Sequence, residues 1–153
     1  ADSVTLVDQS ERALQGAEEA AQLNGLQEKV TSIHANAFDV LKGQQRAGEL
    51  YDLISLDPPA FAKNRRSLEG AYRGYKEINL RAMMMLKPGG SLISSSCSYH
   101  MSLAEFEGML QEAALDVGRS VQLLERRIQA LDHPELLGFP ESRYLKCYIM
   151  RVL

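Results

Sequence analysis

The sequence predicts an α/β fold built on a mostly parallel sheet that ends in an antiparallel strand. Short apolar runs alternate with longer segments whose apolar residues recur at helical spacing, in the order β-α-β-α-β-α-β-α-β-β. The last two apolar runs follow one another without a helix between them, so we expect them to pair antiparallel. With 153 residues the chain is long enough for a proper core, and we expect one domain over residues 1–153.

The first part of the chain supplies three expected strands and two expected helices. The strands cover residues 4–7, 30–35 and 51–56, and the helices cover residues 10–23 and 38–45. Asn24-Gly25 ends the first helix, because glycine readily adopts the left-handed conformation that stops a helix. Each of the three strands is followed by a polar side chain.

The second part supplies two more helices and three more strands. We expect a loop over residues 62–70, a helix over 71–86, and strands over 91–95, 121–128 and 144–153. Lys87-Pro88-Gly89-Gly90 ends the helix before the strand at 91–95. Ser102 and Glu105 have the spacing of a capping box and begin another helix, which ends near Gly118.

The stretch from Leu53 to Phe61 is the most informative part of the sequence. A short apolar run reaches Asp57 and is followed by Pro58 and Pro59. Neither proline can extend a sheet ladder, and Pro58 disfavours helix at the residue before it. Asp57 must therefore stand at the carboxyl end of a strand, where open α/β sheets bind their ligands. A stiff Asp-Pro-Pro step there holds a carboxylate and backbone carbonyl groups in fixed positions.

Polar candidates follow four of the expected strands: Asp8, Asn36, Asp57 and Cys97. With right-handed crossovers, parallel strands bring these ends to one rim of the sheet. Asp8 can accept both hydroxyls of a ribose, or can instead cap the helix that follows it. Asn36 can accept from an adenine amino group, with Phe38 near the ring, but taken alone it fits a turn residue better.

Cys97 lies in the segment Ser-Cys-Ser just after its strand, flanked by small polar residues. A thiol at a strand end, near backbone donors, can be held as a thiolate and act as a nucleophile. His100 could tune it, although no spacing requires this. Cys147 lies inside an alternating strand and is expected to be structural.

Composition excludes several classes of protein. Two cysteines fifty positions apart fit neither a disulfide scaffold nor a metal site, so a reducing cytoplasm is the expected location. No secretory signal is visible, and no apolar run approaches the roughly 20 residues needed to cross a membrane. The net charge of −3 argues against nucleic-acid binding over the whole surface, but leaves local basic patches open.

The order of these motifs resembles that of Rossmann-type S-adenosylmethionine-dependent methyltransferases. The matching motifs are Val-Asp at 7–8, Asn-Ala-Phe at 36–38, Asp-Pro-Pro-Ala-Phe at 57–61, Arg-Gly-Tyr-Lys-Glu-Ile-Asn at 73–79 and Ser-Cys-Ser at 96–98. More narrowly, the chain is similar to the bacterial 23S rRNA cytosine-5 methyltransferases that carry an N-terminal PUA domain. The similarity covers essentially the whole chain, including Asp-His-Pro at 132–134 and Tyr-Leu-Lys at 144–146.

The resemblance implies a role for each matching residue. Asp8 would hold the ribose of S-adenosylmethionine, and Asn36, Ala37 and Phe38 would face its adenine, although the family more often has aspartate at the position of Asn36. Asp57 and Pro58 would face the methionine end. Residues implied to contact the RNA are Pro59, Phe61, Lys63, Arg65, Arg66 and Arg73, of which the basic ones fit a solvated loop almost as well.

The implied chemistry begins with addition of the Cys97 thiolate to C6 of cytosine, which activates C5 for methylation. Asp57 would stabilise charge developing at N3. Relatives with two cysteines place one after the prolines to help release, but Ala60 stands there, so the releasing base is not identified. The target cytosine must be unpaired or flipped out to reach the thiol.

The glycine-rich cofactor loop and the PUA domain of the family are not found in this sequence. We therefore expect a longer parent protein to be the enzyme, and this N-terminally truncated stretch, which lacks the first strand, to be inactive or nearly so. The strands that end in Asp8 and Asp57 would then pair directly, or their exposed edges would be covered by another chain, such as a second copy. Two alternatives stay open: an Asp-Pro-Pro amino-methyltransferase of RNA or DNA, which needs no cysteine, and a non-catalytic RNA-binding remnant.

Overall fold

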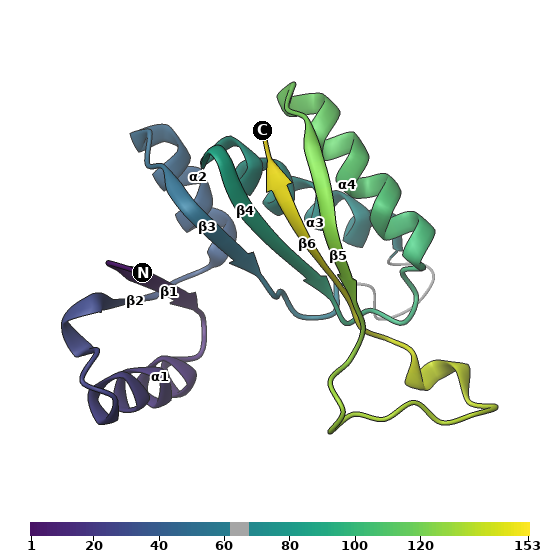
Figure 1. Ribbon diagram of the computed structural model, residues 1–153, viewed down its shortest axis with the longest axis horizontal. Coiled ribbons are helices and arrows are strands. Elements are labelled where there is room, and N and C mark those ends of the chain that lie inside the picture. The colour runs from purple at the N-terminus through teal and green to yellow at the C-terminus, as the bar shows by residue number, and fades with distance from the viewer. Residues whose placement is uncertain (62–67) are drawn as a thin grey trace. The chain divides into compact units, whose positions relative to one another are not determined.

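The computed structural model describes residues 1–61 and 68–153, which form two compact units, residues 1–47 and 48–153 (Figure 1). In the described ranges, no helix is long and apolar enough to span a membrane. Each unit contains parallel strands connected through helices, which confirms the predicted α/β fold. The expected single sheet is divided in two, a two-stranded sheet in the first unit and a four-stranded sheet in the second.

The first unit is a β-α-β-α segment. Its elements are β1 (Val4–Asp8), α1 (Glu11–Leu23), a short 3₁₀ turn (Gln27–Lys29), β2 (Val30–His34) and α2 (Ala37–Ala47). Strands β1 and β2 pair in parallel, so that Asp8 lies opposite His34 at their carboxyl ends. Within this unit the two strands form a ladder of five residue pairs, from Val4 opposite Val30 to Asp8 opposite His34.

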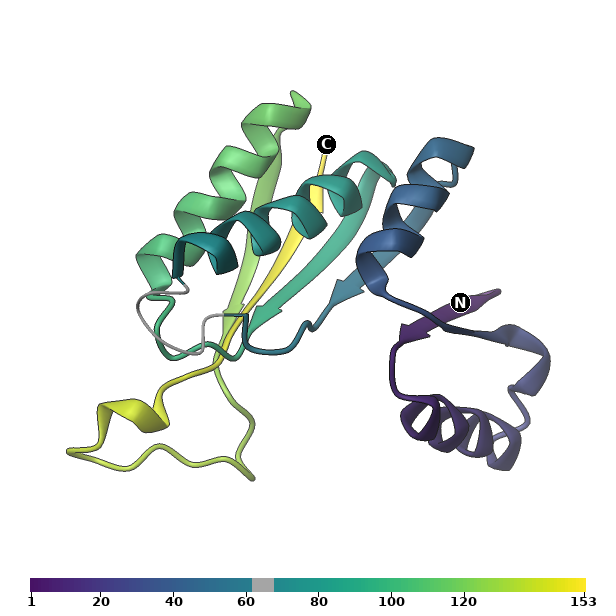
Figure 2. The ribbon, with the colours of Figure 1, turned by 180° about the vertical axis from the view of Figure 1, so that it is seen from behind.

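The second unit holds most of the core. Its elements are β3 (Tyr51–Leu56), α3 (Leu68–Met84), β4 (Leu86–Ser96), α4 (Leu103–Val117), β5 (Val121–Arg127), a 3₁₀ turn (Pro140–Ser142) and β6 (Lys146–Val152). The strand order is β3-β4-β6-β5. Strand β6 runs antiparallel to both neighbours, as the sequence predicted for the last pair. Figure 2 shows α3 and α4, in teal and green, side by side on one face of this sheet.

Both ends of α3 differ from the sequence prediction, and its start at Leu68 falls inside the loop expected over 62–70. The helix expected over 71–86 ends at Met84, and the strand expected to begin at 91 begins at Leu86. The reason is that the chain pairs with β3 immediately after α3 ends, because the Tyr51 amide donates a hydrogen bond to the carbonyl of Met85 at 2.8 Å. Pro88 and the two glycines that follow it therefore lie in the irregular start of β4, where the pairing with β3 shifts register.

Three aromatic rings from different elements form the centre of the core in the second unit. The Phe106 ring of α4 meets the Tyr75 ring of α3 edge-on at 6.3 Å between centroids, and the Tyr148 ring of β6 at 5.4 Å. Tyr75 and Phe106 are fully buried. This packing locks α3 and α4 onto the sheet, and edge-to-face pairs add to the free energy gained by burying the rings.

The predicted capping box is present at the start of α4. The Ser102 hydroxyl accepts from the Glu105 amide at 3.2 Å, and the Ser102 amide donates to the Glu105 carboxylate at 2.7 Å. We expect Ser102→Ala to lower the free energy of unfolding by about 1 kcal/mol, because it leaves an amide of the first turn unpaired. Urea denaturation measures this. Ser120→Ala, which alters an exposed serine beyond the end of α4, is the control, and an equal loss in both variants would contradict the prediction.

Candidate functional site

The Asp-Pro-Pro step and the cysteine lie at the same rim of the four-stranded sheet. Strands β3 and β4 are parallel neighbours, with Leu56 opposite Ser94, so both chains leave the sheet at their carboxyl ends there. Asp57 follows β3 directly and is exposed, while Cys97 follows β4 directly and is half-buried. The structure thus brings together the two residues that the sequence proposed as catalytic on one rim of one unit.

Tyr75 ties the two loops at this rim to one another. Its hydroxyl donates to the carbonyl of Pro59 at 3.4 Å and lies 3.1 Å from the hydroxyl of Ser98. Its ring packs against Phe61, with centroids 4.7 Å apart. Because a phenol has one proton and can also accept, the Ser98 hydroxyl can donate to Tyr75 while Tyr75 donates to Pro59. One buried side chain on α3 therefore sets the spacing between the Asp-Pro-Pro step and the turn of residues 97–101, which is called the cysteine loop below.

Lys146, at the start of β6, is a second residue that binds the cysteine loop. Its ammonium donates to the carbonyls of Ser98 at 2.6 Å and Met101 at 2.7 Å. The residue is only 4% exposed. Burial lowers the pKa of Lys146 to about 8, and attraction to Cys97 and Glu105 offsets part of that effect. The site therefore contains a buried cation that interacts with the proposed nucleophile.

A surface hollow adjoins the cysteine loop. The residues that line it are Leu68, Tyr99, His100, Ser102 and Glu105. The His100 ring meets the Tyr99 ring at 5.5 Å between centroids. The hollow gives a polar ligand a place to lie beside the turn that follows Cys97.

In the first unit, Asp8 and Asn36 follow the carboxyl ends of the parallel strands β1 and β2. One oxygen of Asp8 accepts from the Ser10 amide at 2.7 Å, and Ser10 itself caps α1. The alternative in which Asp8 is the cap is therefore wrong, because the hydroxyl two residues later holds that position. The Asn36 side-chain oxygen accepts from the Phe38 amide at 2.9 Å, which is the turn role that the sequence favoured for it.

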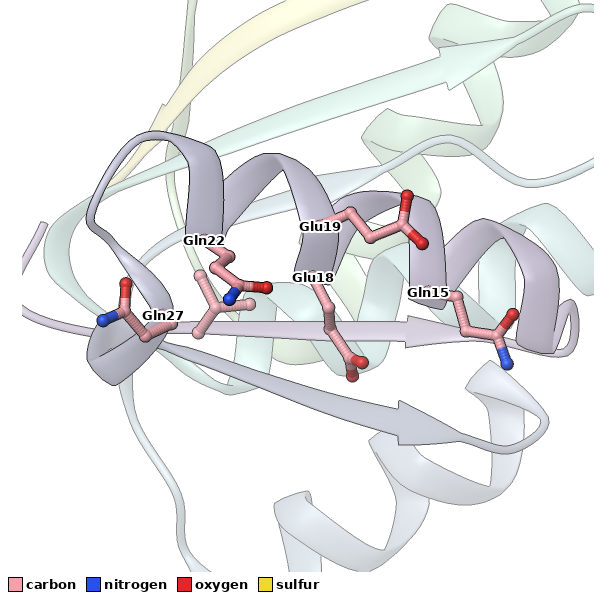
Figure 3. Close-up of a pocket in the computed structure, with 6 residues that line it drawn as sticks. Gln15, Glu18, Glu19, Gln22 and Gln27 are labelled. Carbon is pink, nitrogen blue, oxygen red and sulfur yellow. The ribbon is translucent and has the colours of Figure 1, made fainter.

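A second hollow lies on the first unit, and Figure 3 shows its side chains along the outer face of α1 and the following turn. Its lining is Gln15, Glu18, Glu19, Gln22, Gln27 and Val30. None of the residues predicted to bind cofactor or RNA is among them. This hollow is a polar surface feature of α1 that is separate from the candidate site residues.

The predicted RNA-binding cations are only partly described. Lys63, Arg65 and Arg66 lie outside the described residues. Arg73 is exposed on α3 and forms an ion pair with Glu69, one turn earlier, at 3.1 Å. An exposed pair of this kind contributes little to stability, so Arg73 can exchange its partner for a phosphate at low cost.

Sequence reasoning did not assign roles to Tyr75 or Lys146. Tyr75 stood in a matching motif, but its contact with two separate loops depends on how α3 packs on the sheet. Lys146 left a clearer signal. It occupies the inward position of β6 that Tyr148, Met150 and Val152 also share, and a lysine in an apolar alternation is costly unless it has partners.

Comparison with known proteins identifies a matching family and several similar sequences. The family described as Conserved hypothetical protein 95 matches residues 1–109. The chain is 42% identical over 151 residues to Ribosomal RNA large subunit methyltransferase I of Klebsiella pneumoniae (strain 342), and 46% identical to the protein of that name from Shewanella amazonensis. Each match covers 98% of this chain but only 38% of the relative, so the chain spans about two fifths of those proteins.

A solved structure shows the same fold. The crystal structure of SMU.776, described as a putative methyltransferase complexed with SAH, superposes with a TM-score of 0.83 at 22% identity. The match covers 99% of this chain and 39% of that one. The likeness establishes a Rossmann-like α/β fold for the chain.

Proposed function

Because the chain belongs to the Conserved hypothetical protein 95 family, we propose that it forms the catalytic part of an S-adenosylmethionine-dependent methyltransferase that modifies C5 of a cytosine in large-subunit ribosomal RNA. The observation that supports this proposal is that β3 and β4, which Asp57 and Cys97 follow, are parallel neighbours, and that Tyr75 links Pro59 and Ser98 just beyond them. The names and identities of the relatives support an rRNA substrate. Activity on ribosomal RNA also implies a cytoplasmic protein.

Each unit carries side chains of the kinds that the donors of S-adenosylmethionine require. Asp8 is an exposed carboxylate at a strand end and suits the two ribose hydroxyls. Asn36, with Ala37 and Phe38, would contact the adenine. Asp57 and the carbonyl of Pro58 would accept from the ammonium of the methionine end. When bound, the cofactor supplies a methyl group on a positively charged sulfur.

The chain's own residues would activate the base. Cys97 thiolate adds to C6 and forms a sulfur–carbon bond, which moves electron density to C5. Asp57 would stabilise the charge that develops at N3 by sharing a proton with that nitrogen, which returns to Asp57 when the cysteine leaves. After C5 has gained the methyl group, loss of the C5 proton to a base breaks the bond between Cys97 and C6. Tyr75 and Lys146 hold the cysteine loop during these steps.

RNA would approach the same rim. Pro59 and Phe61 both contact Tyr75, which also binds the cysteine loop. They would pack against a cytosine that has flipped out of its stack. Arg73, with Lys63, Arg65 and Arg66, would contact phosphates.

The test uses the complete gene product, methyl-labelled S-adenosylmethionine and unmodified 23S rRNA, followed by digestion to nucleosides. The proposal predicts label in 5-methylcytidine. Label in a purine would instead identify an amino-methyltransferase and overturn the cytosine assignment. Absence of transfer to any rRNA, in protein shown to be folded, would favour a binding protein.

A further inference from the structure

Lys146 is held in a place where a lysine is costly. It is 4% exposed and faces the core side of β6, directly opposite Ser96, the last residue of β4. Moving an ammonium group out of water costs several kcal/mol unless partners compensate. A neutral side chain of similar length would fill the same space at lower cost, so the charge itself calls for an explanation.

The ammonium is bound to the turn that carries the cysteine. It donates to two backbone carbonyls within residues 98–101, and the Ser98 carbonyl also accepts from the Met101 amide at 3.2 Å. The Ser98 amide donates to the Ser96 hydroxyl at 3.3 Å, and the Ser98 hydroxyl meets Tyr75. Strands β4 and β6 and helix α3 thus fix the residue next to Cys97.

The charges around Lys146 come from several elements. Cys97 at the end of β4 and Glu105 on α4 both attract the ammonium. Glu105 is already engaged in the capping box with Ser102. Among the described residues, the titratable groups around the cysteine loop also include Tyr75 on α3, Tyr99 and His100 in the turn, and Asp57 after β3. The ammonium donates to the carbonyl of Ser98, the residue after Cys97, and a positive charge held close to a thiol favours its reactive, ionised form.

We propose that Lys146 is a positioning residue for Cys97, which fixes the turn of residues 98–101 through two carbonyls and supplies the positive charge that favours the thiolate. The inference rests on the proposed function only in taking Cys97 as the nucleophile. A merely structural lysine would hold the turn without affecting the reactivity of the sulfur through its charge. The two roles therefore differ in how they depend on charge at position 146.

The test measures the rate at which iodoacetamide alkylates Cys97 at pH 7, resolved by peptide mass spectrometry. Alkylation consumes the thiolate, so the rate follows the thiolate fraction. Lys146→Met and Lys146→Gln remove the charge, Gln keeping N–H donors, while Lys146→Arg keeps the charge. We expect the Lys146→Met and Lys146→Gln variants to be alkylated at Cys97 about tenfold more slowly than wild type, the effect of one pKa unit. The rate in the Lys146→Arg variant should stay within about threefold of wild type.

Cys147 is the internal control. It neighbours Lys146 in sequence but points to the other face of β6, because side chains alternate along a strand. Its alkylation rate should stay unchanged, and a rise in that rate would identify a variant that has lost its fold. The proposal would be overturned if the folded Lys146→Gln and Lys146→Arg variants both had the wild-type alkylation rate at Cys97, or if both lowered that rate equally. The measurement needs neither cofactor nor RNA, so its outcome is separate from that of the methylation assay.

Discussion

Cys97→Ala is expected to lower the rate of RNA methylation by at least about 1,000-fold, as loss of a nucleophile does in other enzymes that use covalent catalysis. Without the bond from sulfur to C6, C5 of cytosine is too weak a nucleophile to accept a methyl group. The initial rate with labelled cofactor and 23S rRNA measures the effect. Binding of the RNA should change little, because Cys97 is half-buried and small.

The matched control is Cys147→Ala, which removes the other thiol of the chain from an interior position of β6. We expect it to retain activity within a few-fold, provided that the protein stays folded. A Cys97→Ala variant with more than a tenth of wild-type activity would contradict the proposed mechanism. It would favour direct methylation of an exocyclic amine, which needs no thiol.

Phe106→Ala is expected to lower the free energy of unfolding of the second unit by about 3–5 kcal/mol. The side chain is fully buried between the rings of Tyr75 and Tyr148, so truncation leaves a cavity and removes two edge-to-face contacts. Urea denaturation followed by circular dichroism measures the change. Since Tyr75 also spaces the two site loops, methylation should fall along with stability.

Leu115→Ala on the same helix is the control for that substitution. Leu115 is 78% exposed, so its truncation should change the free energy of unfolding by no more than about 0.5 kcal/mol. A loss under 1 kcal/mol in Phe106→Ala would mean that the aromatic cluster is not the centre of this core. Equal losses in both variants would point to a general effect on α4.

The elements of the second unit were largely predictable because their signals are local. Pro58 and Pro59 end a strand whatever surrounds them, and the Ser102 capping box is satisfied within one helical turn. The start of β4 was not predictable in the same way. It depends on a hydrogen bond between Tyr51 and Met85, residues far apart in sequence, and glycine-rich segments say little about what they pair with.

The positions of Asp57 and Cys97 in the fold were predictable for the same reason. Each follows an apolar run, and parallel pairing of the two strands then brings both to one rim. Tyr75 could not, because its role comes from helix packing rather than from any pattern in α3. Lys146 was visible as a charged residue in an apolar alternation, but the carbonyls that it binds belong to a turn almost fifty residues earlier.

The most direct test of the central claim is to trap the bond between Cys97 and the RNA. With 5-fluorocytidine at the target position, C5 carries fluorine instead of the proton that must leave, so the sulfur–carbon bond cannot be released after methyl transfer. The complete gene product and labelled cofactor should give a protein–RNA adduct that survives denaturation and maps to Cys97. Cys147→Ala should form it and Cys97→Ala should not. Methylated RNA without any adduct, or an adduct at another residue, would contradict the account.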